Sequence, residues 1–134
     1  VNTYMEYAKL NIYEDNLEQA RKYIKLIIEY DAKIRGNDMQ YLPECMAMFS
    51  KDGIGEDEID NLHNKLAENQ DAPANYTQWY YLARAYEKTG NIDKATKCRE
   101  ISQISLKKLS QYNSDRVHAE NMLQNNWLHR EILN

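Results

Sequence analysis

Glycine and proline are scarce in this chain of 134 residues, which contains 4 Gly and 2 Pro. A sandwich or barrel of many short strands needs turn residues far more often, so this scarcity argues against an all-β fold. Long apolar runs are also missing, since no stretch approaches the roughly 18 residues of a membrane-spanning helix. We therefore expect a helical protein whose sequence, over these residues, does not cross a membrane.

Cysteine and excess positive charge are equally rare. Cys45 and Cys98 are the only cysteines, which is too few for a disulfide scaffold, and their spacing does not suit zinc. We favour two buried free thiols, with a single bridge between them left open. The formal net charge is −4, and Lys and Arg are not concentrated in any stretch, so the sequence predicts no nucleic-acid binding.

Motifs for catalysis, cofactors or metals are also missing. There is no nucleophile elbow, no P-loop and no dinucleotide-binding glycine pattern. His63, His118 and His129 lack the spacing of a helical metal pair, and residues 51–58 lack the alternating oxygen ligands of a calcium loop. We therefore expect no enzyme, no cofactor and no metal site. The chain begins at Val1 without a signal-peptide pattern; we expect an excised or processed segment and leave its compartment open, with the cytoplasm favoured.

Apolar residues instead recur at helical spacing along the chain. Two helix pairs are predicted at residues 4–28 and 76–109, with turns at Asp15-Asn16 and at Thr89-Gly90-Asn91. Gly90 suits a left-handed helix C-cap. Between the pairs, helices are predicted at residues 39–49, with Pro43 in the first turn, and at residues 56–68. A last helix is predicted at residues 115–133.

The two helix pairs are similar to each other in sequence. Placing Tyr4 on Trp79 aligns them without a gap and brings Tyr4-x2-Tyr7-Ala8…Asp15-Asn16-Leu17-x2-Ala20 onto Trp79-x2-Leu82-Ala83…Gly90-Asn91-Ile92-x2-Ala95. Here the chain resembles the tetratricopeptide repeat family, whose unit of about 34 residues has a W-x2-L-G-x2-Y…A-x3-F…P pattern. The matching residues of the second pair are Trp79, Leu82, Ala83, Tyr86, Gly90 and Ala95.

The resemblance implies an all-α solenoid of about three stacked antiparallel hairpins. It would cover residues 1–112, with a degenerate middle repeat that ends at Pro73, and residues 113–134 would form a C-terminal capping or connector helix. Arg99 departs from the family pattern, which has Phe there. We expect this helix to be rotated, or Arg99 to be exposed or salt-bridged, because burying an unpaired charge is costly. Helix-pair repeats of another kind are the alternative.

Tyrosine is abundant, with 11 Tyr against 1 Phe, and this residue is favoured at recognition surfaces. We expect Tyr7, Tyr23 and Tyr86 in the core. Tyr13, Tyr80 and Tyr81 are expected at exposed helix edges. In the family, the first helix of each hairpin lines a concave groove, so the resemblance implies a peptide-binding groove lined by Met5 and Ile12 together with Lys9, Tyr13, Thr77, Tyr80, Arg84 and Glu87.

The function predicted on this basis is a scaffold or adaptor that binds a protein or peptide in that groove. The alternative is a sensory or regulatory segment of a larger bacterial signalling or transcription-control protein. The last helix distinguishes the two, because it either packs on the hairpins or projects from them. If Met122, Trp127 and Leu128 are exposed, they predict a homodimer through this helix.

Overall fold

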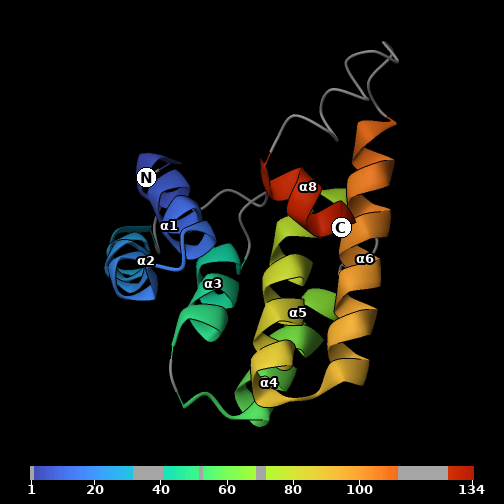
Figure 1. The fold of residues 1–134 in the computed structure, drawn as a ribbon, viewed down its shortest axis with the longest axis horizontal. Coiled ribbons are helices and arrows are strands. Elements are labelled where there is room, and N and C mark those ends of the chain that lie inside the picture. The colour runs from blue at the N-terminus through green and yellow to red at the C-terminus, as the bar shows by residue number, and fades with distance from the viewer. Residues whose placement is uncertain (1, 32–40, 52, 69–71, 112–126) are drawn as a thin grey trace.

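The computed structural model describes residues 2–31, 41–51, 53–68, 72–111 and 127–134, and these contain helices and no β-strand. The predicted all-α class is therefore confirmed. None of the described helices is long and apolar enough to cross a membrane. The elements, shown in Figure 1, are α1 (Asn2–Tyr13), α2 (Leu17–Asp31), α3 (Leu42–Ser50), α4 (Glu56–Ala67), the short 3-10 helix η2 (Pro73–Asn75), α5 (Tyr76–Thr89), α6 (Ile92–Ser110) and α8 (Trp127–Leu133).

The turns after α1 and α5 have the same geometry. Asp15 and Gly90, which align with each other in the two hairpins, both adopt the left-handed conformation, with φ values of 61° and 87°. In each turn, two successive N–H groups donate to carbonyls of the preceding helix, as in a Schellman motif. The bonds are Asp15 N to Ile12 O (3.1 Å), Asn16 N to Asn11 O (2.7 Å), Gly90 N to Glu87 O (3.1 Å) and Asn91 N to Tyr86 O (3.1 Å).

Each turn also begins the next helix in the same way. The side-chain oxygen of Asn16 accepts from the N–H of Gln19 at 3.5 Å, and that of Asn91 accepts from the N–H of Lys94 at 3.0 Å. An N-cap of this kind satisfies a backbone donor that the helix leaves unpaired. Each turn therefore ends one helix and starts the next, so α1 packs along α2 and α5 packs along α6.

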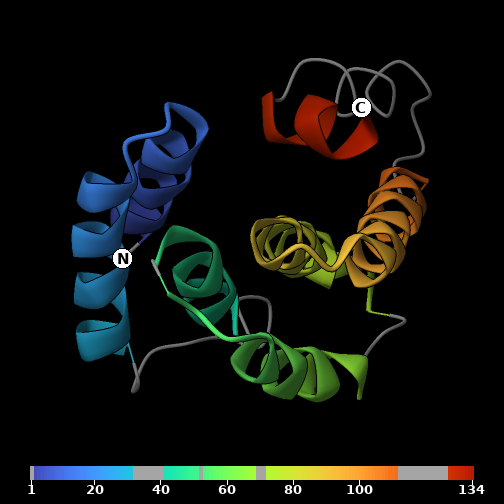
Figure 2. The ribbon, with the colours of Figure 1, turned by 60° about the horizontal axis from the view of Figure 1, so that its bottom comes forward.

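Helix α5 lies at the centre of the molecule, where α3, α4 and α6 pack around it (Figure 2). Its side chains Trp79, Leu82 and Tyr86 are fully buried. The small residues Ala83 and Ala95 are also buried and allow α5 and α6 to approach closely. At the equivalent positions in the first hairpin, Ala8 and Ala20 are buried as well.

Helices α3 and α4 do not form a close hairpin like the other two pairs. α3 packs mainly between α2 and α5, and it contacts α4 only lightly. α3 begins at Leu42 with Pro43 in its first turn, as predicted. α4 begins at Glu56 with three acidic residues in its first turn, where their negative charges interact favourably with the positive end of the helix dipole.

The last helix packs back on the rest of the chain. Leu128 and Ile132 are buried, and the Trp127 ring lies 4.6 Å from the Tyr13 ring of α1. Gln103 of α6 donates to the carbonyl of Ile132 at 3.0 Å. Leu128 is thus covered within the chain, whereas the predicted homodimer through this helix required its exposure. Met122, residues 115–126 and the predicted boundary at residue 112 lie outside the described residues.

Several tyrosines differ from expectation. Tyr80 and Tyr81, which were expected at exposed edges, are 2% and 0% exposed because neighbouring helices surround α5. Tyr7, which was expected in the core, is 47% exposed, and Tyr23 is only partly buried, because no described helix covers that side of the first hairpin. Tyr86 is buried as expected.

Two other expectations are confirmed. Arg99 is partly exposed and forms an ion pair with Glu87 at 2.7 Å, and its guanidinium lies over the Tyr80 ring. Cys45 and Cys98 are buried and not bonded to each other. Burial raises the pKa of Cys98 to about 12 and also raises the pKa of Cys45. Both thiols therefore stay protonated and unreactive near neutral pH.

Candidate protein-binding surface

Apolar side chains are exposed together on the outer side of the first hairpin. We call the set the aromatic face, and it consists of Tyr4, Tyr7, Leu10, Tyr23 and Leu26. Tyr4, Tyr7, Leu10 and Leu26 are each between 40% and 47% exposed. Single exposed apolar residues are ordinary on protein surfaces, but a contiguous group of this kind is typical of an interaction site.

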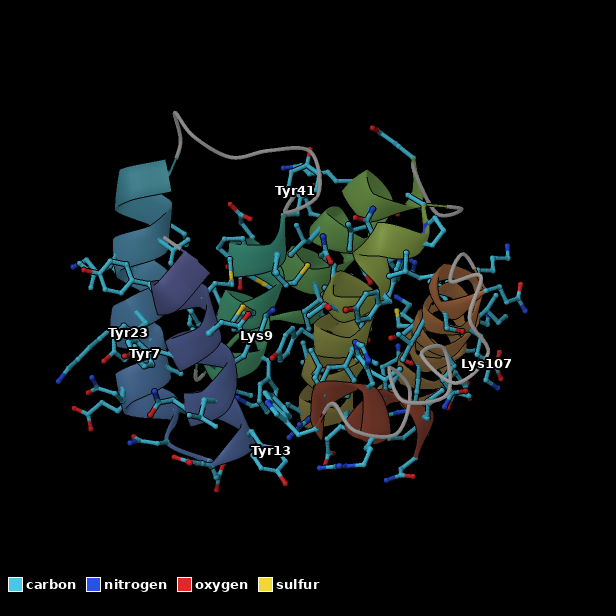
Figure 3. All side chains as sticks on the ribbon, turned by 90° about the horizontal axis from the view of Figure 1, so that it is seen from above. Tyr7, Lys9, Tyr13, Tyr23, Tyr41 and Lys107 are labelled. Carbon is cyan, nitrogen blue, oxygen red and sulfur yellow. The ribbon has the colours of Figure 1, made fainter. Side chains whose placement is uncertain are left out.

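Helical spacing and ring contacts hold this face together. Steps of three residues place Tyr4, Tyr7 and Leu10 along one side of α1, and place Tyr23 and Leu26 along one side of α2. The Tyr23 ring lies 6.0 Å from the Tyr4 ring and 5.3 Å from the Tyr7 ring, so it joins the two helices. Figure 3 shows Tyr7 and Tyr23 side by side on the edge of the molecule that points away from α3.

The positions of the second hairpin that align with the aromatic face are covered. Four of the five are fully buried and the fifth is partly buried against the core. Helices α3 and α4 both pack on α5, and the His63 ring of α4 lies 5.3 Å from the Trp79 ring. The pairs are Tyr4 and Trp79, Tyr7 and Leu82, Leu10 and Ala85, Tyr23 and Cys98, and Leu26 and Ile101. The aromatic face thus has the sequence positions of a helix-packing surface, and none of the described helices lies on it.

A polar network shows how α4 is held on the covered side. The Tyr86 hydroxyl donates to Asp60 Oδ1 at 2.6 Å, and Lys94 Nζ lies 2.9 Å from the same oxygen. His63 Nδ1 lies 3.1 Å from the Tyr86 hydroxyl oxygen. Because the single hydroxyl hydrogen of Tyr86 goes to Asp60, His63 Nδ1 must be the donor in that bond.

The electrostatics keep each group of this network in one ionisation state. Hydrogen bonds from Tyr86 and then Lys94 lower the pKa of Asp60, and the bond to Asp60 raises the pKa of Lys94. Burial lowers the pKa of His63 and, together with the bond to Asp60, raises the pKa of Tyr86. These shifts favour charged Asp60 and Lys94 and neutral His63 and Tyr86, so the network fixes α4 in place.

The residues predicted to line a peptide groove do not form one open surface. Thr77 and Tyr80 are buried, and so are Met5 and Ile12. Arg84 Nη1 donates to the Tyr80 hydroxyl at 2.9 Å, and the guanidinium lies over the Phe49 ring at 4.4 Å. The structure therefore brings Tyr80 and Arg84 together, but as part of the packing between α3 and α5.

Of the other predicted groove residues, Lys9 and Tyr13 lie on α1 and Glu87 lies on α5. Lys9 points from α1 toward α3, as Figure 3 shows, and its ammonium lies 3.3 Å from Glu6. Tyr13 lies at the end of α1 against Trp127. Glu87 is exposed and paired with Arg99. The surface that sequence reasoning missed is the aromatic face, although the alignment of the two hairpins already placed Tyr4 and Tyr7 on Trp79 and Leu82.

A hollow of about 360 Å³ opens between α2 and α3. Its lining combines apolar and cationic side chains, namely Arg21, Ile24, Lys25, Ile28, Ala47, Ser50 and Lys51. Arg21 donates to the carbonyl of Ser50 at 2.9 Å, and nearby Lys88 donates to that of Phe49 at 2.6 Å. Arg21 and Lys88 thus satisfy carbonyls that the end of α3 leaves unpaired. Helix capping accounts for these two cations.

Within the described part of the chain, no three His, Cys, Asp or Glu side chains gather as a metal ion would require. Comparisons with protein-family models, with curated proteins and with solved structures find no match to this chain. The candidate site therefore depends on the geometry of the aromatic face and on the internal comparison of the two hairpins.

Proposed function

We propose that this chain is a protein-binding module that docks a helical element of another chain on its aromatic face. The observation that supports this most directly is the contrast between the two hairpins. Four of the five positions are fully buried in the second hairpin, where α3 and α4 pack on α5, whereas the equivalent positions of the first hairpin are exposed or only partly buried. A surface with the spacing of a helix-packing interface is best covered by a helix, because ridges of side chains pack into the grooves between them.

The proposal treats the hairpins as two copies of a tetratricopeptide-like unit in a stacked array. The gapless alignment of their sequences, the matching turns at Asp15 and Gly90, and the buried alanines at matching positions all support this interpretation. In such arrays each unit packs on its neighbours, and a terminal unit needs a polar outer face to stay soluble. The aromatic face is not polar, so we infer that it is covered when the protein functions.

The composition of the face also favours protein binding. Three of its five residues are tyrosines, which combine a large contact area with a polar hydroxyl group and are enriched at interfaces. Their rings already contact one another, so little side-chain freedom remains to be lost on binding. We propose this binding role in place of catalysis, and in place of the groove that the sequence predicted.

Site-specific photo-crosslinking tests the proposal. Benzoylphenylalanine in place of Tyr7 is expected to crosslink to a helical segment of another chain in an extract of the native cells. A matched variant with the same amino acid in place of Ile104, which is 55% exposed on α6, controls for general exposure. Crosslinks that are absent at position 7, or equal in yield and identity at positions 7 and 104, would contradict the proposed function.

A further inference from the structure

We propose that the aromatic face is covered by the same face of a second copy of this chain, in a two-fold dimer in which α1 and α2 of each copy pack together. This inference rests on the proposed function and names the partner. The polar side chains that border the face differ from those that border the covered side of the second hairpin, and this difference indicates what covers the face.

The covered side of the second hairpin has a border that recognises acids. Tyr86, Asn91 and Lys94 form it, and α4 meets it with two carboxylates, Asp60 and Glu56. Asn91 donates to Glu56 at 2.6 Å, and Lys94 lies 2.9 Å from Asp60 and 3.7 Å from Glu56. The cation Lys94 and the acidic helix α4 are therefore matched in charge.

Three of the polar positions that border the aromatic face are neutral. Asn11, Asn16 and Gln19 align with Tyr86, Asn91 and Lys94, so an amide stands at each border position and the cation is replaced. Carboxylates like those of α4 would lose their charged partner there and would be desolvated without compensation. At these three positions, neutral groups that both donate and accept hydrogen bonds match the amides, and apolar side chains match the centre of the face.

The face and its border fit that description themselves. All eight residues are uncharged, with three tyrosines and two aliphatic side chains at the centre and three amides at the edge. Amides and tyrosine hydroxyls each donate and accept hydrogen bonds, so two such surfaces are able to satisfy each other. A two-fold interface presents one patch to its own copy, and these residues bring no like charges together there. A second copy of the chain therefore has the required chemistry.

Sedimentation equilibrium of the full 134-residue chain tests the dimer. We expect a reversible monomer–dimer equilibrium between about 1 µM and about 500 µM. Tyr7→Glu and Leu26→Glu each place a charge in the face and are expected to weaken dimerisation at least about tenfold. Ile104→Glu, on an exposed part of α6, is the matched control and should leave the equilibrium unchanged. Circular dichroism would verify that each variant is folded.

Two results would overturn the inference. One is a wild-type chain that stays monomeric over the whole range, and the other is a dimer that tolerates both charged substitutions in the face. If the chain is monomeric but benzoylphenylalanine at position 7 still crosslinks to a segment of a different protein, the dimer is wrong and the proposed function stands. If position 7 gives no crosslink either, both are wrong.

Discussion

Tyr81 and Tyr86 lie on the same helix, and their hydroxyl groups meet opposite surroundings. Tyr86 donates to Asp60 at 2.6 Å and accepts from His63. The Tyr81 hydroxyl is buried and has no hydrogen-bond partner among the described residues. Burial raises the pKa of both phenols, so each stays neutral at any ordinary pH. The two residues therefore contribute differently to stability although both are buried.

Replacing each tyrosine by Phe separates these contributions. Tyr81→Phe removes a buried hydroxyl that makes no bond, and we expect the free energy of unfolding to stay the same or rise by up to about 1 kcal/mol. Tyr86→Phe leaves His63 and Asp60 without their hydrogen-bond partner and should lower the free energy of unfolding by about 1–3 kcal/mol. Urea unfolding followed by circular dichroism measures both values. Equal losses in the two variants would show that the Tyr81 hydroxyl has a partner.

His63 gives the network a dependence on pH. Its pKa is lowered in the folded protein by burial, whereas an unfolded His titrates near pH 6.5. Below about pH 6.5 the unfolded chain therefore binds more protons than the folded one, and stability falls as the pH is lowered through this range. Asp60, whose pKa is also lowered, adds a further loss below about pH 4.

We expect the free energy of unfolding to fall as the pH is lowered below about 6.5, and to fall less steeply in His63→Asn. Asn stays neutral, and its amide nitrogen reaches roughly the position of Nδ1, so the bond to Tyr86 can persist. Urea unfolding at a series of pH values gives the slope for each protein. If both proteins have the same slope, His63 is not the group responsible.

At the scale of helices and turns, the Schellman turns after α1 and α5 differ in one important residue. Gly90 adopts its left-handed conformation without cost, and a Cβ added there would meet nothing within 4 Å. Asp15 adopts the same conformation with a side chain, which is disfavoured for residues other than glycine. The first hairpin thus has the less favourable residue at an otherwise equivalent turn.

Exchanging the residue types at these turns should have opposite effects. Gly90→Ala is expected to lower the free energy of unfolding by about 1 kcal/mol, through backbone strain alone. Asp15→Gly should raise it by up to about 1 kcal/mol, since the strain of a non-glycine residue is removed. Thermal and urea unfolding measure both. A loss of stability in Asp15→Gly would mean that the carboxylate makes a contribution larger than the strain.

At the scale of the whole molecule, helix positions were predictable and helix neighbours were not. Asp15-Asn16, Gly90-Asn91 and Pro43 act within one turn of the chain, so the sequence places the helix ends near them correctly. Burial depends on which helix lies opposite. Tyr7 and Leu82 occupy equivalent positions in their hairpins, yet Leu82 is buried and Tyr7 is exposed, because among the described helices none covers this side of α1. Periodicity alone could not separate these two cases.

The candidate site was missed for the same reason. Reasoning from the sequence placed binding on Tyr80, which is buried because α5 is the central helix. The same reasoning assigned Tyr7 to the core. The expectation that the helix is rotated, or that Arg99 is exposed or salt-bridged, followed from the cost of burying a charge and needed no knowledge of the fold. Predictions based on the chemistry of one residue were therefore more successful than those based on the arrangement of helices.

The last helix contacts both hairpins, because α8 packs on α6 of the second hairpin while Trp127 contacts Tyr13 of α1 in the first. Ile132 is fully buried in this contact, and Tyr76 and His129 are linked by a hydrogen bond of 3.0 Å. Ile132→Ala is expected to lower the free energy of unfolding by about 2–4 kcal/mol, because it leaves a cavity beneath α8.

Hydrogen exchange locates the effect of that substitution. If α8 is a structural part of the fold, Ile132→Ala should speed amide exchange in α8 and in the facing turns of α6, while exchange in α2 stays unchanged. Tyr13→Ala is the matched control, since it removes the contact with Trp127 but leaves Ile132 buried, and it should affect α8 far less. If α8 in the wild-type protein exchanges as fast as an unstructured peptide, this helix is not docked on α6 in solution.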